Sequence, residues 1–329
     1  MRVVVTGASG NIGSCVLDTL EADDRVGAVV GIARRPPGRE VRSKITWAAA
    51  DLSTDPLVHL LRGADVVIHL AWKIQPSWDH EVLERTNVVG SHRTFEAVAE
   101  AGVPAIVHAS SVGAYAPGPK EPPVDESWPL GGYPGHPYSV HKAEVEGLLD
   151  RFEADHPDRR VVRLRPCLVF QTAAGREIRR YFLPRHLPGF VLNPSVLARN
   201  PARFQVVHAT DVADAFVTAA LGDASGPFNI ATDDVIGGRA LPFLDKVLRP
   251  LASVTWRLHL QPVDPGWVGL VFRSPTLDST RARRELGWAP RHSGHAAFAE
   301  GLRAMADPPA PSTPALSGEE SRATIEQTR

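Results

Sequence analysis

The first half of the chain alternates short runs of β-branched residues with segments of helical periodicity. RVVVTG at residues 2–7 is typical of a buried strand, and four apolar residues then follow at helical spacing, Ile12, Val16, Leu17 and Leu20. Five further apolar runs with helix-like segments between them continue the alternation, at 26–33, 45–51, 64–71, 104–111 and 159–166. This pattern predicts an α/β fold in which helices cover both faces of a parallel sheet.

The pattern becomes irregular after Pro166. A strand-like RFQVVHA at 203–209 is followed by a helix from about Asp211 to Leu221 and by a further strand, PFNIA, at 227–231. The irregular pattern after Pro166 indicates a second, smaller domain assembled from several insertions.

We therefore expect a first domain at residues 1–166, completed by about 204–232. The smaller domain would consist of residues 167–203 and 233–304. Residues 305–329 are rich in proline, serine and charge. Because they carry little apolar surface to offset the entropy of ordering, we predict that they form a disordered tail.

The composition of the chain favours a function on small molecules. The 329 residues are 43% hydrophobic and 22% charged, with a formal net charge of -1, so nothing attracts nucleic acid or an anionic membrane. Cys15 and Cys167 belong to no CxxC pair, and no zinc-type cluster is present, so we expect no metal and a reducing cytoplasm. No apolar run approaches the length of a membrane span. A small-molecule substrate is the expected partner, with no nucleic acid and no membrane.

Gly7, Gly10 and Gly13 have GxxGxxG spacing directly after the first strand and at the start of a helix. Glycines at such a turn allow the backbone to approach a pyrophosphate, which then lies at the positive N-terminus of the helix. The alternative is an ordinary strand-to-helix turn. The position after a buried strand favours a dinucleotide site.

The second strand ends in GIARRPPG, where a site for NAD would usually carry an acidic residue. It carries Arg34 and Arg35 instead. Arginine can pair with a ribose 2'-phosphate, so NADP(H) is favoured over NAD, whereas the alternative is a solvated surface pair. Asp51 and Leu52 follow the third strand and would suit the adenine edge. The alternative there is a helix N-cap at Asp51 or Ser53.

HPYSVHK at 136–142 places Tyr138 and Lys142 one turn apart on the same face of a helix. A phenol titrates near pH 10, but a neighbouring ammonium and a positive nicotinamide ring would both stabilise the phenolate. Tyr138 could then exchange a proton with a substrate hydroxyl or carbonyl oxygen. The alternative is an exposed pair at the start of a helix.

Taken together, these residues resemble the extended short-chain dehydrogenase/reductases, the NAD-dependent epimerase/dehydratase family. The resemblance covers about residues 1–290 and rests on nine motifs in order, TGASGNIG, ADVVIHLA, NVVGS, HASSVGAY, YSVHK, RLRP, VVHATDVADAF, GPFNIA and DSTRARRELGWAP. It implies a doubly wound parallel sheet of the Rossmann type with a smaller C-terminal substrate domain. It also implies a Ser-Tyr-Lys site and a homodimer formed through the helix that carries Tyr138.

Residue by residue, the resemblance implies a catalytic set of Ser111, Tyr138 and Lys142. Ser111 lies four residues before Tyr115, and Ser110 is the less favoured serine. Ser111 would hold the substrate oxygen and Lys142 the nicotinamide ribose. The implied cofactor-binding residues are Gly7, Ser9, Gly10, Asn11, Ile12, Gly13, Arg34, Arg35, Asp51, Leu52, Leu70, Ala71, Asn87, Tyr138, Lys142 and Pro166. His208 and Asp211 resemble a structural segment of the family.

Departures from the family pattern reduce the number of reactions that fit this chain. Val112 and Gly113 replace the Asp-Glu pair that 4,6-dehydratases carry, which argues against elimination. Phe204 stands where sugar-nucleotide epimerases carry an arginine for the diphosphate, with Arg203 one residue out of register, and Cys167 replaces the usual asparagine.

The function that we expect is an NAD(P)-dependent epimerase or dehydrogenase acting at a secondary alcohol or carbonyl, with a nucleotide sugar as candidate substrate. An NADPH-dependent carbonyl reductase is the alternative. A non-catalytic NAD(P)-binding sensor or scaffold is the alternative of another class. Trp267 and Phe272 are candidates for apolar or stacking walls of the substrate pocket, or for core packing.

Overall fold

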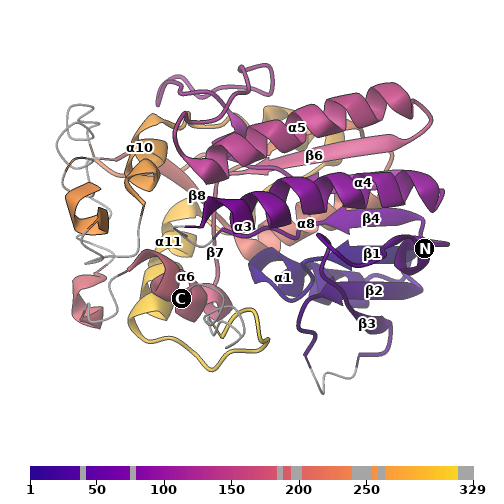
Figure 1. Ribbon diagram of the computed structural model, residues 1–329. Helices are drawn as coiled ribbons and strands as arrows, with labels where there is room; N and C mark the ends of the chain where they lie inside the picture. Colours follow the sequence, from indigo (N-terminus) through magenta and orange to yellow (C-terminus); the bar gives the residue numbers. More distant parts are fainter. Residues whose placement is uncertain are drawn as a thin grey trace.

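A seven-stranded, entirely parallel sheet forms the centre of the molecule (Figure 1). The computed structural model describes residues 1–37, 42–74, 79–183, 188–193, 202–238, 250, 253–257 and 264–317. The sheet order is β3-β2-β1-β4-β5-β6-β9. The strands are β1 Arg2–Thr6, β2 Ala28–Ala33, β3 Ile45–Ala49, β4 Val66–His69, β5 Ala105–Ala109, β6 Arg160–Pro166 and β9 Gly226–Ile230. The predicted doubly wound fold is confirmed.

Helices cover both faces of this sheet, which is why the central strands are apolar throughout rather than alternating. Helices α4 (Gly90–Glu100) and α5 (Pro137–Asp155) pack on one face, and α1 (Asn11–Ala22) and α8 (Ala209–Leu221) on the other. Shorter helical segments complete the connections, α2 Val58–Leu61, α3 His80–Glu84, the π-helical turn η1 Arg85–Val89 and the 3-10 turn η2 Val112–Ala114.

A smaller lobe lies beyond one end of the strands of this sheet, on the left in Figure 1. Its three-stranded sheet has the order β10-β8-β7, with bounds Val235–Ile236, Phe204–His208 and Leu168–Phe170. The other elements of this lobe are η3 Thr172–Ala174, α6 Gly175–Phe182, η4 Gly189–Val191, α10 Pro265–Arg273 and α11 Gly294–Ala306. The π-helical turn η5 Ala282–Leu286 packs instead against β9 of the large sheet and against α8. Within the segment 204–232, expected to complete the first domain, β9 joins the large sheet, whereas β8 belongs to the small one.

Residues 305–317 are packed against the protein, which corrects the expectation of disorder for this part of the tail. Helix α11 continues to Ala306, Thr313 is 9% exposed and Leu316 is fully buried. Prolines in DPPAPSTPALS restrict the unfolded chain and so reduce the entropy lost on ordering. Arg176 and Arg179 of α6 also donate hydrogen bonds to backbone carbonyls of this segment. Residues 318–329 lie outside the described residues.

A buried carboxylate on α5 connects that helix to two strands of the large sheet. Glu146 is fully buried and accepts from Arg165 of β6 through Nε (2.7 Å) and Nη2 (3.0 Å). Arg163 Nη1 (3.2 Å) and the Ser110 hydroxyl (2.5 Å) also donate to it. Burial alone would raise the pKa of the Glu146 carboxyl, but the hydrogen bonds and charges of these partners hold that pKa below its usual range. The network fixes α5 against the ends of β5 and β6.

We predict that Glu146→Gln lowers the free energy of unfolding at neutral pH by about 3–5 kcal/mol, because it leaves buried guanidinium charge uncompensated. Since the folded carboxyl has a lowered pKa, its stabilisation is present above the unfolded pKa of about 4.3 and is lost as the pH falls through the folded value. The difference in the free energy of unfolding between wild type and variant should therefore be smaller in acid than at neutral pH. Urea unfolding at neutral and at acid pH measures this difference.

The matched control is Glu144→Gln, since Glu144 is exposed on the same helix. That variant should unfold within about 0.5 kcal/mol of wild type. Equal unfolding midpoints for the variants at positions 144 and 146 would contradict the assignment.

Candidate active site

The glycine turn between β1 and α1 leaves no room for side chains at two positions. Gly7 has φ +68°, and a Cβ there would lie 2.6 Å from the backbone nitrogen of Ala71, just beyond β4. A Cβ on Gly13 would lie 2.3 Å from the Gly7 carbonyl oxygen. Helix α1 begins at Asn11, and no side chain caps it at Gly10. The first N–H groups of a helix lack intrahelical partners, so this cradle fits a dinucleotide pyrophosphate.

Charged side chains gather at the carboxyl ends of the neighbouring strands, the edge at which such sheets bind ligands. Arg34 is exposed after β2, and Asp51 is half-buried after β3. Burial alone would raise the pKa of Asp51, but hydrogen bonds from Ser53 and the charges of Arg34 and Lys73 hold it below its usual range. The Asp51 carboxylate accepts both the backbone N–H (2.9 Å) and the hydroxyl (2.6 Å) of Ser53. Asp51 thus forms a local turn with Ser53 rather than the helix N-cap considered as its alternative, since α2 begins only at Val58, and it also lies within the field of Arg34.

Two residues expected to contact the cofactor engage their side-chain amides in hydrogen bonds within the protein. Asn11 accepts from Gln171 Nε2 (2.9 Å) and donates to the Val169 carbonyl (3.3 Å). Asn87 bonds both the N–H (2.7 Å) and the carbonyl (3.0 Å) of Lys73. Both side-chain amides are thus engaged within the protein, and a contact of either residue with the cofactor stays a prediction.

The remaining expected cofactor residues surround the same cradle. Leu70 and Ala71 pack under Gly7, whereas the Leu52 side chain belongs to the apolar core on the α4–α5 side of the sheet. Ser9 is buried within the turn, and Ile12 packs partly against the core on the α1 side. Pro166 ends β6 beside Ile230 of β9, and Arg35 is exposed next to Arg34.

The structure brings Ser111, Tyr138 and Lys142 together. Ser111 follows β5, and its Oγ accepts the Tyr138 hydroxyl at 2.9 Å and the Gly113 N–H at 3.0 Å. Tyr138 is the second residue of α5, and Lys142 follows one turn later, with Nζ 6.0 Å from the phenol ring centroid. A Cβ on Gly113 would lie 2.8 Å from Tyr138 Cε1, so this glycine lets the phenol reach Ser111.

Burial dominates the protonation of this set. It raises the pKa of Tyr138 to about 12, and the hydrogen bond with Ser111 only partly opposes it. Burial also places the pKa of Lys142 well below its usual value, although the charge of Glu146 opposes this. Lys142 donates to the Ala109 carbonyl (2.7 Å). The stabilisation of the phenolate by Lys142 stays a prediction.

Aromatic rings enclose the tyrosine and the lysine. The Trp72 ring centroid lies 3.4 Å from Lys142 Nζ, and Trp72 also packs edge-on against Tyr138 at 6.1 Å. Trp267 of α10 lies 5.1 Å from Tyr138 and 4.6 Å from His136. Trp267 thus lies against the catalytic set, which agrees with the prediction of an apolar or stacking wall rather than with the alternative of core packing. Trp72, Lys73 and Glu146 were missed, although Trp72 directly follows the HLA motif and Glu146 lies one turn after Lys142.

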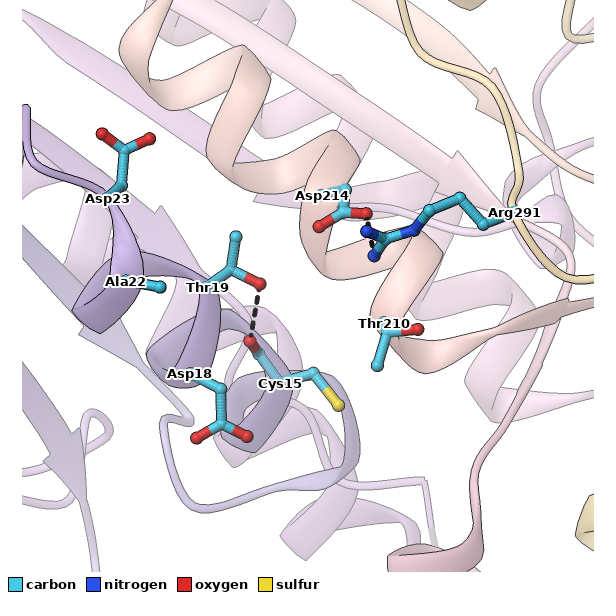
Figure 2. Close-up of a pocket in the computed structure, with 8 residues that line it drawn as sticks. All are labelled: Cys15, Asp18, Thr19, Ala22, Asp23, Thr210, Asp214 and Arg291. Carbon is cyan, nitrogen blue, oxygen red and sulfur yellow. Dashed lines mark hydrogen bonds and ion pairs between the residues drawn. The ribbon is translucent and has the colours of Figure 1, made fainter.

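A hollow of about 410 Å³ between α1 and α8 lies apart from the catalytic set (Figure 2). It is lined by Cys15, Asp18, Thr19, Ala22, Asp23, Thr210, Asp214 and Arg291. Arg291 forms an ion pair with Asp214, and burial raises the pKa of the Cys15 thiol to about 11. Nearby, Asp211 accepts from the N–H and the ring of His292 (both 3.0 Å), and His208 caps the start of α8. The contacts of Arg291 and His292 join the segment before α11 to α8.

Within the described ranges, no three His, Cys, Asp or Glu side chains come together as a metal site. Over the same residues, no helix combines the length and apolar character needed to cross a bilayer.

Comparison with known proteins agrees with this geometry. Residues 3–231 match the model of the NAD dependent epimerase/dehydratase family. The chain belongs to that family. Its glycine cradle and its Ser111, Tyr138 and Lys142 cluster therefore lie in an NAD(P)-dependent enzyme.

Individual relatives cover almost the whole chain. A UDP-glucose 4-epimerase of Mycolicibacterium smegmatis is 32% identical over 92% of this chain and 96% of its own. The solved structure of MoeE5 in complex with UDP-glucuronic acid and NAD is 25% identical, with a TM-score of 0.66 over 92% of this chain and 98% of that one. A farnesyl-dihydroquinoline-oxide ketoreductase of Stigmatella aurantiaca is 27% identical over 88% of this chain and 92% of its own.

We predict that Gly13→Ala weakens NAD(H) binding at least about tenfold, since the new Cβ must displace the Gly7 carbonyl and deform the pyrophosphate cradle. Titration of NADH by its fluorescence measures the affinity. Gly147→Ala on α5 is the matched control, because a Cβ there meets nothing within 4 Å. An unchanged dissociation constant in Gly13→Ala would remove the turn from the binding site.

Proposed function

We propose that this enzyme is an epimerase that moves a hydride and a proton at a secondary alcohol of a nucleotide sugar, with Ser111, Tyr138 and Lys142 as its catalytic residues. The observation that carries the proposal is the 2.9 Å hydrogen bond from the Tyr138 hydroxyl to Ser111 Oγ, with Lys142 one turn away on the same helix. The UDP-glucose epimerase relative and the MoeE5 complex support a nucleotide sugar as substrate.

Each residue has a distinct task in this proposal. Tyr138 takes the proton of the substrate hydroxyl during oxidation and returns it during reduction. Ser111 holds the same oxygen in line with the phenol. Lys142 leaves the Ala109 carbonyl to bind the nicotinamide ribose, and its charge then favours the phenolate. NAD(P), held by the glycine cradle, supplies the hydride acceptor and donor.

The raised pKa of Tyr138 matters for this cycle. A phenol that titrates near 12 is protonated at neutral pH and can serve as the acid of carbonyl reduction. Acting as base requires positive charge near the phenol to lower that pKa. Lys142 and the positively charged nicotinamide ring would therefore supply the positive charge that lowers the pKa of Tyr138.

We expect Tyr138→Phe to lower turnover about 10²–10⁴-fold while leaving the dissociation constant of NADH within about threefold of wild type. The assay supplies UDP-hexoses and follows both epimer formation, by chromatography, and net change in reduced nicotinamide absorbance. Tyr181→Phe removes a hydroxyl on α6 and serves as control. If every measurable turnover survived in Tyr138→Phe, the protein would instead fit a sensor or a scaffold that binds the cofactor without using this site.

A ketone reductase using NADPH is the second candidate. The rings of Trp72 and Trp267 give Tyr138 apolar neighbours that suit an aromatic or isoprenoid ketone. Arg203 forms an ion pair with Glu121 (2.9 Å), so the arginine nearest the family's diphosphate position is engaged elsewhere. The ketoreductase relative supports this candidate. Net consumption of NADPH with ketones, without epimerisation of any UDP-hexose, would favour it.

We further propose that Arg34 gives the site a preference for NADP(H). Arg34→Ala should weaken NADPH binding about tenfold and leave NADH binding unchanged, because only NADPH carries the 2'-phosphate. Arg25→Ala, at an exposed arginine paired with Asp23, is the matched control. Equal loss of affinity for both cofactors would place Arg34 outside the 2'-phosphate site.

A further inference from the structure

The segment that follows α11 crosses the molecule to the glycine turn. Arg179 donates to the Met305 carbonyl (2.6 Å), and Arg176 donates to the carbonyls of Pro308 (3.4 Å) and Pro309 (3.3 Å). Thr313 then donates its hydroxyl to the Ser9 carbonyl at 2.6 Å, between residues 304 positions apart in the sequence. We call residues 307–317 the C-terminal strap.

The contact at Ser9 is a buried one. Ser9 is 6% exposed and Leu316 is fully buried. Gly10 N–H donates to the Gly7 carbonyl (3.0 Å) on the inner side of the turn, and Thr313 meets the carbonyl that precedes Gly10. A buried carbonyl needs a hydrogen-bond partner, and Thr313 provides it.

Thr313 also organises the end of the strap. Its Oγ1 accepts the Leu316 N–H (3.3 Å), and its carbonyl accepts the Ser317 N–H (3.2 Å). One hydroxyl therefore connects the Ser9 carbonyl to a local turn whose Leu316 is fully buried. Replacing that hydroxyl by a methyl group, as in Thr313→Val, removes the hydrogen bond between the strap and the glycine turn and nearly keeps the volume of the side chain.

We propose that the C-terminal strap is part of the dinucleotide site, and that Thr313 is a positioning residue that slows the departure of bound NAD(P)(H). The strap reaches the protein one residue before Gly10, the N-cap of α1, where the pyrophosphate would lie. In this proposal the strap detaches from Ser9 before the dinucleotide leaves the cradle. Dissociation is then limited by breaking the contact between Thr313 and Ser9.

Slow dissociation fits the proposed function, on which this inference rests only for the binding of a dinucleotide at the glycine turn. An epimerase reduces its cofactor in one half-reaction and needs the same molecule for the other half. Cofactor that escapes between them leaves an oxidised sugar and an idle enzyme. A reductase must instead exchange its cofactor at every turnover, so the strap would limit its rate.

The experiment measures the dissociation rate of NADH from the full chain and its variants, by stopped-flow fluorescence with excess NAD as competitor. Thr313→Val keeps the side-chain shape and removes the donor, and we expect its dissociation rate to rise about five- to tenfold. A chain ended after Asp307 should release NADH faster still. Association rates should change less than dissociation rates in both variants.

Two controls separate the hydroxyl from general loosening. Thr313→Ser restores the donor and should return the dissociation rate to near that of wild type. Ser312→Ala removes a neighbouring exposed hydroxyl and should have no effect. Thermal unfolding of each variant without cofactor reports whether the fold is intact, so a truncated chain that unfolds still leaves Thr313→Val as the decisive measurement.

An unchanged dissociation rate in Thr313→Val would overturn the proposal. Tighter binding after truncation would also overturn it, since the strap would then compete with the cofactor. If the full chain binds neither NADH nor NADPH, the proposed function fails together with the strap. If it binds and epimerises normally while every variant releases NADH at the same rate, the strap alone fails.

Discussion

The ion pair between Glu146 and Arg165 fixes the relation between the helix and the strands that carry the catalytic set. Tyr138 and Lys142 belong to α5, whereas Ser111 follows β5, so their geometry depends on how α5 lies on the sheet. Apolar packing of Val145 and Leu149 holds the helix against that face but resists sliding weakly. The bidentate contact of Glu146 with Arg165, together with the hydroxyl of Ser110, defines one position along the helix axis.

Much of this architecture could be predicted because it depends on local pattern. Alternating apolar runs and helical segments give a parallel sheet, and glycine spacing after a buried strand gives the phosphate turn. The contacts within the site could not be predicted in this way. Trp72 and Lys142 are 70 positions apart, and the direction of the Asn11 amide depends on Gln171 in the other lobe. Such pairings follow from the packing of whole elements, which a local pattern does not contain.

The error over residues 305–317 has a specific physical origin. The composition of this segment shows that it has few large apolar residues. It does not show that side chains elsewhere in the protein can form hydrogen bonds with its backbone carbonyls. Two arginines of α6 bind those carbonyls, and one leucine is fully buried. The prolines also favour the ordered state, because a proline-rich segment has less conformational entropy to lose when it folds. A segment of tail-like composition can therefore be held by a few polar contacts.

The start of α5 has a consequence for the tolerance of this region to change. Pro137 is the first helical residue, and His136 before it is extended, so the helix cannot shift its origin towards the N-terminus. Side chains on a helix lean towards its N-terminal end, which takes the phenol of Tyr138 beyond the first turn of α5 and towards Ser111. Each residue of a helix is rotated by about 100° from the next. One residue inserted between Tyr138 and Lys142 would turn the two side chains to different faces, whereas most substitutions between them would preserve the alignment.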